Sequence, residues 1–234
     1  MVIAYMIEDA IEAFKKGEPV LIYDSDCRER ETDLAYPAAS VKPKDVLRMR
    51  KDAGGLICVA IHPMAAKKLS LPFMEEILNE AGKKMELLRR IILKPKYDRT
   101  TSFSLWVNHK DTFTGITDVD RALTIRKISE AVEKSLNGGK FNFFEEFVSP
   151  GHVALLRAAD NLIYDRAGHT ELSIALAEIA GIVPAVAICE MLDEETGRAL
   201  TKQKAMMYAK ENEIPFVEGN KIIEVYKSAK FTRS

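Results

Sequence analysis

The sequence predicts a layered α/β protein with a mostly buried sheet, and two observations lead to this fold class. Three apolar runs have strand length and no polar alternation, as in strands covered on both faces: Pro19–Tyr23, Leu56–Ile61 and Ala185–Met191. Segments with helical spacing of apolar residues lie between them, which is typical of layered α/β folds. Because no repeat or flexible linker divides the chain, residues 1–234 are predicted to form one domain.

The elements of the N-terminal part follow from spacing and from Gly and Pro. Apolar residues recur at helical intervals from Ile7 to Phe14, and Gly17 closes this first helix. Pro43 is a typical first residue of a helix, and Gly54 and Gly55 precede the second strand. After the strand at 19–23, the predicted order is a polar segment at 24–33, a helix at 44–52, a strand at 56–61 and mostly helical structure at 62–96.

The C-terminal part continues the alternation. Ser102–Val107 alternates as a strand does, and Asp118 or Asp120 is expected to cap a helix that Asn137–Lys140 ends. Core spacing of apolar residues predicts a further helix over His169–Ala180. The other predicted elements are a short apolar segment at 153–158, a strand at 185–191, a helix at about 201–212, a strand near Phe216 and a last helix that reaches Ser228.

Composition excludes several classes of protein. The chain has 34 basic and 35 acidic residues, so its net charge of −1 argues against a whole-chain nucleic-acid or membrane-surface binder. Its 3 cysteines, widely spaced, fit neither a disulfide framework nor a CxxC zinc site. No apolar stretch is long enough for a signal peptide or a membrane span. A soluble cytoplasmic protein is therefore expected.

The densest polar segment, Asp24–Asp33 (DSDCRERETD), directly follows a predicted strand. Ligands bind at strand ends in open α/β sheets, and clustered carboxylates suit a hard divalent cation. The interleaved arginines suit an anionic substrate. The alternative is a solvated, ion-paired loop, because runs of charge usually lie on the surface.

Two further segments contain histidine. Arg166–Glu171 (RAGHTE) opens a predicted helix, where backbone N–H groups, an arginine and a threonine hydroxyl can cradle a phosphate. A simple helix cap explains the same residues equally well. Ser149–His152 (SPGH) places a histidine in an expected Pro-Gly turn, either as an acid or base or as an exposed side chain.

Two weaker signals complete the set. Phe113–Arg121 (FTGITDVDR) leads into a predicted helix, either as an anion site or as an N-cap. Glu190 is a charge within an apolar strand, where burial would raise its pKa and suit it to proton transfer. A strand end that reaches solvent would explain Glu190 without chemistry.

Taken together and in this order, these segments resemble the 3,4-dihydroxy-2-butanone 4-phosphate synthases of riboflavin biosynthesis, in a monofunctional, archaeal-like form. One departure is Thr32, where bacterial members usually have glycine. The resemblance spans roughly residues 20 to 192 and is carried by YDSDCRERETDL, GGLICVAI, FTGITDVDRALTIR, SPGHVALLRAA, RAGHTE and AVAICEM.

The resemblance implies a lyase that converts D-ribulose 5-phosphate into L-3,4-dihydroxy-2-butanone 4-phosphate and formate, through metal-assisted enolisation and a skeletal rearrangement. It also implies a three-layer α/β/α sandwich with a mixed sheet, and a homodimer whose active sites contain residues from both chains. By analogy Glu29 and His169 hold the metal, which is Mg²⁺ with Mn²⁺ as a substitute, at two ions per site.

The resemblance assigns the other site residues as well. His152 and Glu190 match the residues essential for the chemistry and are read as proton-transfer groups. Arg166 and Thr170 grip the phosphate with help from Thr114, while Asp24, Glu31 and Cys58 line the pocket. The residues expected to bind substrate are Arg28, Glu29, Asp33, Thr114, Arg166, Ala167, Gly168, His169, Thr170 and Glu190.

Two other functions remain as alternatives. A metal-dependent sugar-phosphate aldolase or isomerase would use a similar set of carboxylates and histidine, but it would not release formate. An RNA- or nucleotide-binding module is a second alternative, because a related three-layer fold serves that purpose elsewhere. The near-zero net charge and the lack of a basic, aromatic-rich face argue against this module.

Overall fold

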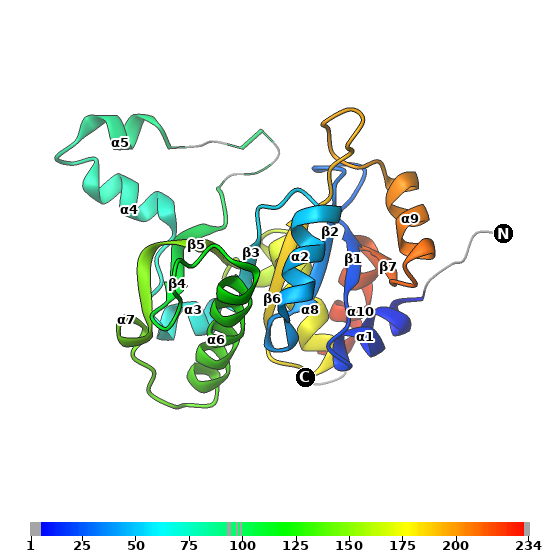
Figure 1. Ribbon diagram of the computed structural model, residues 1–234, viewed down its shortest axis with the longest axis horizontal. Coiled ribbons are helices and arrows are strands. Elements are labelled where there is room, and N and C mark those ends of the chain that lie inside the picture. Colours follow the sequence, from blue (N-terminus) through cyan, green and yellow to red (C-terminus); the bar gives the residue numbers. More distant parts are fainter. Residues whose placement is uncertain (1–5, 93–94, 97, 99, 232–234) are drawn as a thin grey trace.

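The computed structural model describes residues 6–92, 95–96, 98 and 100–231, and its described strands form one seven-stranded sheet (Figure 1). The predicted strands at 19–23, 56–61, 102–107, 185–191 and near 216 are confirmed with small shifts of their ends. The strands are β1 (Val20–Tyr23), β2 (Thr32–Pro37), β3 (Cys58–Ile61), β4 (Phe103–His109), β5 (Phe147–Arg157), β6 (Ala185–Glu190) and β7 (Phe216–Glu218).

The helices confirm the predicted alternation. The helix expected at 169–180 has those bounds, and the first helix ends two residues before Gly17. The helices are α1 (Ile7–Lys15), α2 (Pro43–Asp52), α3 (Pro63–Lys68), α4 (Met74–Ala81), α5 (Glu86–Arg90), α6 (Asp118–Leu136), α7 (Phe143–Glu146), α8 (His169–Ala180), α9 (Lys202–Glu211) and α10 (Gly219–Phe231), with 3₁₀ turns η1 (Ala38–Ser40) and η2 (Leu162–Tyr164).

The sheet is mixed, with the strand order β4-β5-β3-β6-β2-β1-β7. Strand β1 runs parallel to β7 and β3 runs parallel to β5, whereas the other neighbouring pairs are antiparallel. Central strands β3 and β6 are buried almost throughout, which explains why the sequence shows them as continuous apolar runs.

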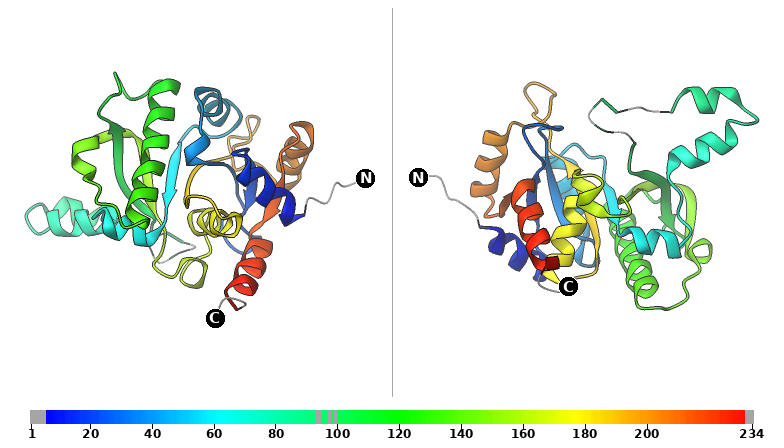
Figure 2. Two further views of the ribbon diagram at one scale, coloured as in Figure 1. Left: turned by 90° about the horizontal axis from the view of Figure 1, so that it is seen from below. Right: turned by 180° about the vertical axis from the view of Figure 1, so that it is seen from behind.

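Helices cover both faces of the sheet, so the expected three-layer α/β/α sandwich is confirmed (Figure 2). Successive residues of β1 point to opposite faces: Leu21 and Tyr23 join one core, and Val20 and Ile22 join the other. The first core is closed mainly by α2, α3, α6 and α9. The second is closed by α1, α8 and α10, with α8 packed across the middle of the sheet.

Three local predictions are wrong. The polar segment ends at Glu31, because Thr32 and Asp33 begin β2, a strand that the sequence reading missed. Thr117, rather than Asp118 or Asp120, caps α6: its side chain accepts the backbone N–H of Asp120. The SPGH segment lies within β5 and is not a tight turn.

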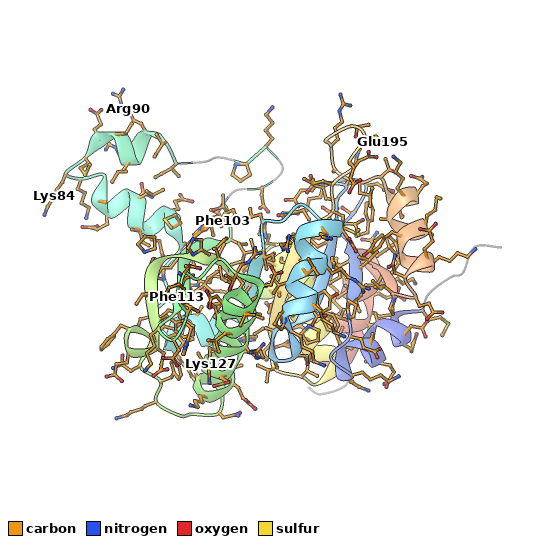
Figure 3. The ribbon with its side chains drawn as sticks, viewed as in Figure 1. Lys84, Arg90, Phe103, Phe113, Lys127 and Glu195 are labelled. Atoms are coloured by element: carbon orange, nitrogen blue, oxygen red, sulfur yellow. The ribbon has the colours of Figure 1, made fainter. Side chains whose placement is uncertain are left out.

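The region expected to be mostly helical at 62–96 contains three short helices, and part of it lies outside the described residues. Helices α4 and α5 have no buried residues and project away from the sheet at the upper left of Figure 1. Lys84 and Arg90 lie toward the far end of this projection (Figure 3). In the part of the chain that the structure describes, no helix has the length and apolar character to cross a membrane.

Candidate active site

Three of the five predicted polar motifs meet at one end of the sheet: the acidic segment, the helix entry at 166–171 and Glu190. The loop after β1, the start of β2, the end of β6 and the first turn of α8 surround a cavity of about 110 Å³. Its described lining residues are Glu29, Asp33, Cys58, Pro95, Thr100, Thr101, Ser102, Phe103, Leu156, Arg166, His169, Thr170, Ile188 and Glu190. Seven of these are residues that the sequence singled out.

The acidic loop is organised around Asp24. Its carboxylate is 3% exposed and accepts the backbone N–H groups of Glu29 at 2.8 Å and of Glu31 at 3.1 Å. The Asp24 carboxylate also lies 3.5 Å from the Arg28 guanidinium. The segment at 24–31 is therefore ion-paired, as the alternative expects, and Asp26, Cys27 and Arg30 are exposed, but its Asp24 end is buried and not solvated.

His169 joins the acidic loop to α8. Its Nδ1 lies 3.1 Å from a Glu29 carboxylate oxygen and its Nε2 lies 3.1 Å from the backbone oxygen of Glu31. Burial alone would lower the pKa of His169, but the neighbouring carboxylates, Asp33 first and then Glu29, outweigh it and raise this pKa to about 9.

The donor atoms around His169 fit a divalent cation. One ligand atom each of Asp24, Glu29 and His169 lie within 4.8 Å of one another. Two carboxylate oxygens and an imidazole nitrogen match Mg²⁺ or Mn²⁺, with space left for water and substrate oxygens. These residues could therefore hold the metal that the sequence predicts at Glu29 and His169.

Two further carboxylates face each other across neighbouring strands. Asp33 of β2 and Glu190 of β6 are paired in register. Burial raises the pKa of Asp33 well above its usual range, and an Asp33 carboxylate oxygen is buried with no hydrogen bond in the structure. Burial also raises the pKa of Glu190, as the sequence predicts for a charge in an apolar strand, and Glu29 adds to this effect.

The helix entry at 166–171 combines a helix cap with an arginine that is held in place by its neighbours. Gly168 is the N-cap of α8, and the buried Glu171 carboxylate accepts the N–H groups of Gly168 at 3.3 Å and Ala159 at 3.0 Å. The same carboxylate binds Arg166 Nη1 at 2.8 Å, and the Ser102 hydroxyl accepts from this nitrogen at 3.0 Å. Thr170 is buried in the first turn beside His169.

His152 and Thr114 form a separate group, because neither is among the described residues that line this cavity. His152 is exposed on β5, and its backbone N–H donates to Asn108 Oδ1 at 2.8 Å while its Nδ1 lies 3.2 Å from Asn108 Nδ2. Thr114 is held by its backbone N–H, which donates to Asp120 at 3.2 Å. The structure therefore does not bring His152 into contact with Glu190 within one chain.

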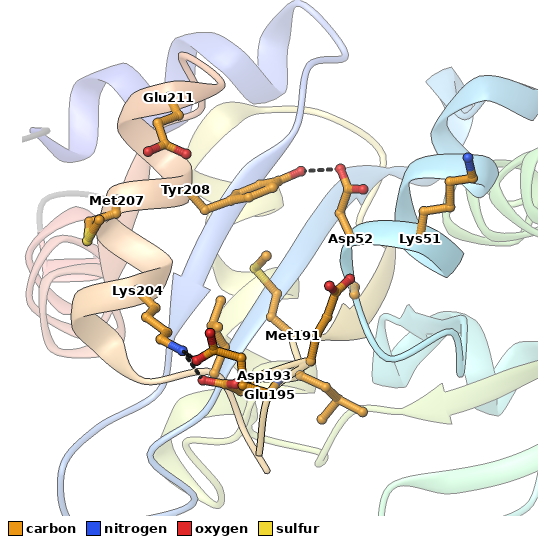
Figure 4. A pocket seen from close by; sticks show the side chains of 13 residues that line it. Lys51, Asp52, Met191, Asp193, Glu195, Lys204, Met207, Tyr208 and Glu211 are labelled. Atoms are coloured by element: carbon orange, nitrogen blue, oxygen red, sulfur yellow. Dashed lines mark hydrogen bonds and ion pairs between the residues drawn. The ribbon is translucent and has the colours of Figure 1, made fainter. Parts of the chain in front are cut away.

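A second, more open cavity lies between the end of α2, the segment after β6 and α9 (Figure 4). It measures about 490 Å³, but the residues described around it include none of those predicted for the site. Several of its polar groups are paired with one another: Tyr208 donates to Asp52 at 2.6 Å, and Lys204 binds Asp193 at 2.7 Å. We place the active site in the smaller cavity.

Several residues of the site escaped sequence reasoning. Asp98 contacts both Arg28 and Arg166, and its neighbours Thr100–Phe103 line the cavity. Asp98 lies in a charged stretch of ordinary composition, so no local signal marks it. Asn108, which holds His152, and Glu171, which holds Arg166, become visible only through contacts across the fold.

Comparisons with known proteins identify the family of the chain. The family model of 3,4-dihydroxy-2-butanone 4-phosphate synthase matches residues 8–225. The protein of that name from Archaeoglobus fulgidus is 62% identical over 222 residues, covering 94% of this chain and 93% of its own. The one from Methanosarcina mazei is 55% identical over 223 residues, covering 94% and 90%.

Solved structures give the same result. The Candida albicans enzyme superimposes with a TM-score of 0.73 at 29% identity, covering 94% of this chain and 96% of its own. A 3,4-dihydroxy-2-butanone 4-phosphate synthase in complex with two magnesium ions gives a TM-score of 0.74 at 27% identity, covering 96% and 97%. The chain belongs to the 3,4-dihydroxy-2-butanone 4-phosphate synthase family.

Proposed function

We propose that the cavity around His169 converts D-ribulose 5-phosphate into L-3,4-dihydroxy-2-butanone 4-phosphate and formate for riboflavin biosynthesis. The observation that carries the proposal is the 3.1 Å contact between Glu29 and His169, residues 140 positions apart. It joins the acidic loop to the helix entry that carries Arg166, and so unites cation ligands and a phosphate ligand in one cavity.

Glu29 and His169 would hold the metal, and Asp24 lies close enough to complete the group of ligands. When bound, a divalent cation polarises the substrate oxygens and favours the enediol. The relative with two magnesium ions supports Mg²⁺ at two ions per site, and the mixture of oxygen and nitrogen ligands makes Mn²⁺ an acceptable substitute.

The substrate phosphate would bind at the start of α8. Backbone N–H groups at a helix N-terminus attract anions, and here the first two of α8 belong to His169 and Thr170. Ala167 and the N-cap Gly168 lead into them, and the Gly168 N–H is held by Glu171. Arg166 and Arg28 add two guanidinium groups beside Gly168. The sugar hydroxyls would then lie toward Glu29, Asp33 and Glu190, which line the same cavity.

The experiment that tests the proposed function is formate release from D-ribulose 5-phosphate by the purified chain. We expect one formate for each substrate consumed, because five carbons divide into a four-carbon phosphate and one formate. Release should stop with a chelator and return with Mg²⁺. Consumption of the sugar phosphate without formate would instead favour an aldolase or isomerase.

We further propose that two copies of the chain share each active site. His152 and Thr114 are not among the described residues that line the cavity, and the segments around them expose several apolar side chains, which is typical of an interface. Phe113, the residue before Thr114, is 97% exposed, and it lies on the same half of the molecule as Phe103 (Figure 3). The other exposed apolar residues of these segments are Trp106, Ile116, Val119 and Val148.

Complementation tests this arrangement. A one-to-one mixture of refolded Glu190→Gln and His152→Ala chains should recover about a quarter of wild-type activity, although each variant alone is nearly inactive. About half of the dimers would be mixed, and each mixed dimer would have one intact site. A mixture of Glu190→Gln with Glu29→Gln is the matched control, because both changes lie on the same side of the shared site and should leave no intact site. Equal recovery in both mixtures would contradict sharing.

Arg166→Lys should raise KM for ribulose 5-phosphate by about tenfold although the charge is kept. A guanidinium can bind two phosphate oxygens in parallel, whereas an ammonium acts as a point charge. Arg166 contacts Ser102 and Glu171 through Nη1, which leaves its other nitrogens for the phosphate. The single nitrogen of a lysine side chain cannot make both sets of contacts. Steady-state kinetics at saturating Mg²⁺ measure the change. An unchanged KM would make Arg166 an ordinary residue of the helix entry.

Two broader expectations stay proposals. One sheet that helices cover on both faces supports a single domain over residues 1–234. The cytoplasmic location rests on the cysteine content of the sequence, and Cys27, Cys58 and Cys189 are free thiols in the structure.

A further inference from the structure

Two arginines of the candidate site, Arg28 and Arg166, bind the same carboxylate. This carboxylate belongs to Asp98, which lies outside the predicted motifs. Asp98 Oδ2 lies 2.9 Å from Arg28 Nη2 and also accepts from Arg166 Nε. All three side chains are largely buried, with exposed fractions of 17% for Asp98, 11% for Arg28 and 14% for Arg166. Guanidinium groups bind phosphate as readily as carboxylate, so the two arginines that hold Asp98 would also suit a phosphate group.

The other side of Arg166 is fixed in place. Its Nη1 binds the fully buried carboxylate of Glu171 at 2.8 Å and the Ser102 hydroxyl at 3.0 Å. The opposite edge of the guanidinium group, at Nε, donates to Asp98. Gly168 packs directly against both arginines: a Cβ atom there would lie 2.5 Å from Arg166 Nη1 and 2.8 Å from Arg28 Nη2. The two guanidinium groups therefore sit at the N-terminus of α8, where an anion is favoured.

The size of the cavity agrees with an occupied anion position. Pockets that bind small molecules usually measure ~300–1,000 Å³, whereas this cavity measures about 110 Å³. Residues on both sides of Asp98 in the sequence, Pro95 and Thr100–Phe103, line the cavity. When Asp98 pairs with the arginines, Pro95 and Thr100–Phe103 therefore occupy space beside the site.

We propose that Asp98 is an internal anion that occupies the phosphate position on Arg28 and Arg166 and must be displaced by the substrate. The inference rests on the proposed function, because it takes the phosphate site to be the one formed by these arginines. Asp98 is then a specificity-determining residue. A phosphate dianion offers more charge and more acceptor oxygens than a carboxylate and can displace it, whereas an unphosphorylated sugar cannot.

Such competition has a measurable cost in affinity. If only a fraction of the molecules has the arginines available, the apparent dissociation constant rises by the inverse of that fraction. Removing the carboxylate should abolish this cost for any phosphate ligand, inorganic phosphate included. A residue that merely positions the arginines would have the opposite effect, because its loss would weaken phosphate binding.

Calorimetric titration of inorganic phosphate into the full chain, at low ionic strength with a chelator present, tests the inference. Asp98→Ala and Asp98→Asn should each lower the phosphate Kd by about tenfold. Asp160→Asn is the matched control. It also removes a carboxylate paired with an arginine, Arg157, but outside the cavity lining, and it should leave the phosphate Kd unchanged.

Phosphate affinity that is unchanged or weaker in both Asp98 variants would overturn the inference. An equal gain in Asp160→Asn would overturn it too, because general loss of negative charge would then explain the effect. Phosphate binding is measured without turnover, so the two proposals fail in different ways. Failure of the proposed function appears as absence of formate from the wild-type chain, whereas failure of this inference appears only in the Asp98 titrations.

Discussion

Glu29→Gln and His169→Ala should each reduce turnover of ribulose 5-phosphate by about 10³-fold or more while the fold is retained. A divalent cation supplies several kcal/mol of stabilisation to developing negative charge, and each ~1.4 kcal/mol is worth a factor of ten in rate. The two side chains meet at 3.1 Å and lie with Asp24 in the cluster that fits a cation. Loss of either side chain should weaken binding of the ion. Without the ion, enolisation of the substrate should nearly stop.

Binding of the ion should be measured beside the rate. Titration calorimetry with Mn²⁺ should show weaker binding in both variants, and circular dichroism should show an unchanged fold. Neighbouring carboxylates raise the pKa of His169 to about 9, so both of its ring nitrogens carry a proton at neutral pH. A metal must displace one of these protons to bind the ring. The apparent metal affinity of the wild type should therefore rise with pH up to about 9.

Matched controls are available for both changes. Glu224→Gln removes an exposed carboxylate paired with Lys221, and His62→Ala removes a ring paired with Glu178 outside the described cavity lining. Both should retain wild-type turnover. Full activity of either site variant at ordinary Mg²⁺ would exclude that residue from the metal site.

Most of the fold could be predicted because the buried strands and amphipathic helices are marked by strong local patterns. Strand β2 was missed because it begins with Thr32 and Asp33, polar residues at 0% and 1% exposure that continue an acidic segment. The tertiary fold buries them against β1 and β6, and no local rule shows that burial. The SPGH segment was misread because Pro and Gly usually mark turns, whereas here they lie in β5, where Gly151 approaches the backbone of β4 closely.

The site could be predicted in its motifs but not in its connections. The acidic loop, the helix entry and the strand end are each visible in the sequence. The resemblance to a family then predicts that they belong to one site. That Glu29 contacts His169, or that His152 lies apart from Glu190, depends on how distant segments pack. Asp98 illustrates the limit most clearly, because its role comes from contacts with Arg28 and Arg166 and not from its sequence surroundings.

Glu190→Gln and His152→Ala should each lower kcat by about 10² or more, the usual scale for one acid–base group. Burial raises the pKa of Glu190, which brings its proton affinity closer to neutral pH and makes it a better base than an ordinary carboxylate. Glutamine keeps the shape of Glu190 and removes the proton acceptor. His152 is exposed on β5 and its backbone is held by Asn108, which leaves its ring accessible to the second copy in the proposed dimer.

The dependence of kcat/KM on pH should be bell-shaped. A base must be ionised, so activity should be lost as the pH falls through the raised pKa of the Glu190 group, above the ordinary value of 4.5. An acid must be protonated, so activity should also be lost at high pH. Because Glu190 lies among Asp33, Glu29 and His169, the acidic limb belongs to the whole group.

The two variants should change this profile differently. His152→Ala should remove one limb and, under the proposed sharing of active sites, should be complemented by Glu190→Gln in a mixed dimer. Glu190→Gln should flatten the acidic limb, and unchanged circular dichroism in both variants would exclude a loss of fold. If both variants retain wild-type kcat and the same profile, the assignment is wrong. Glu190 would then be a structural carboxylate, and the base would have to be sought among Asp24, Glu31 and Asp33. Asp33 is the first to test, because it is paired with Glu190 in register and burial raises its pKa.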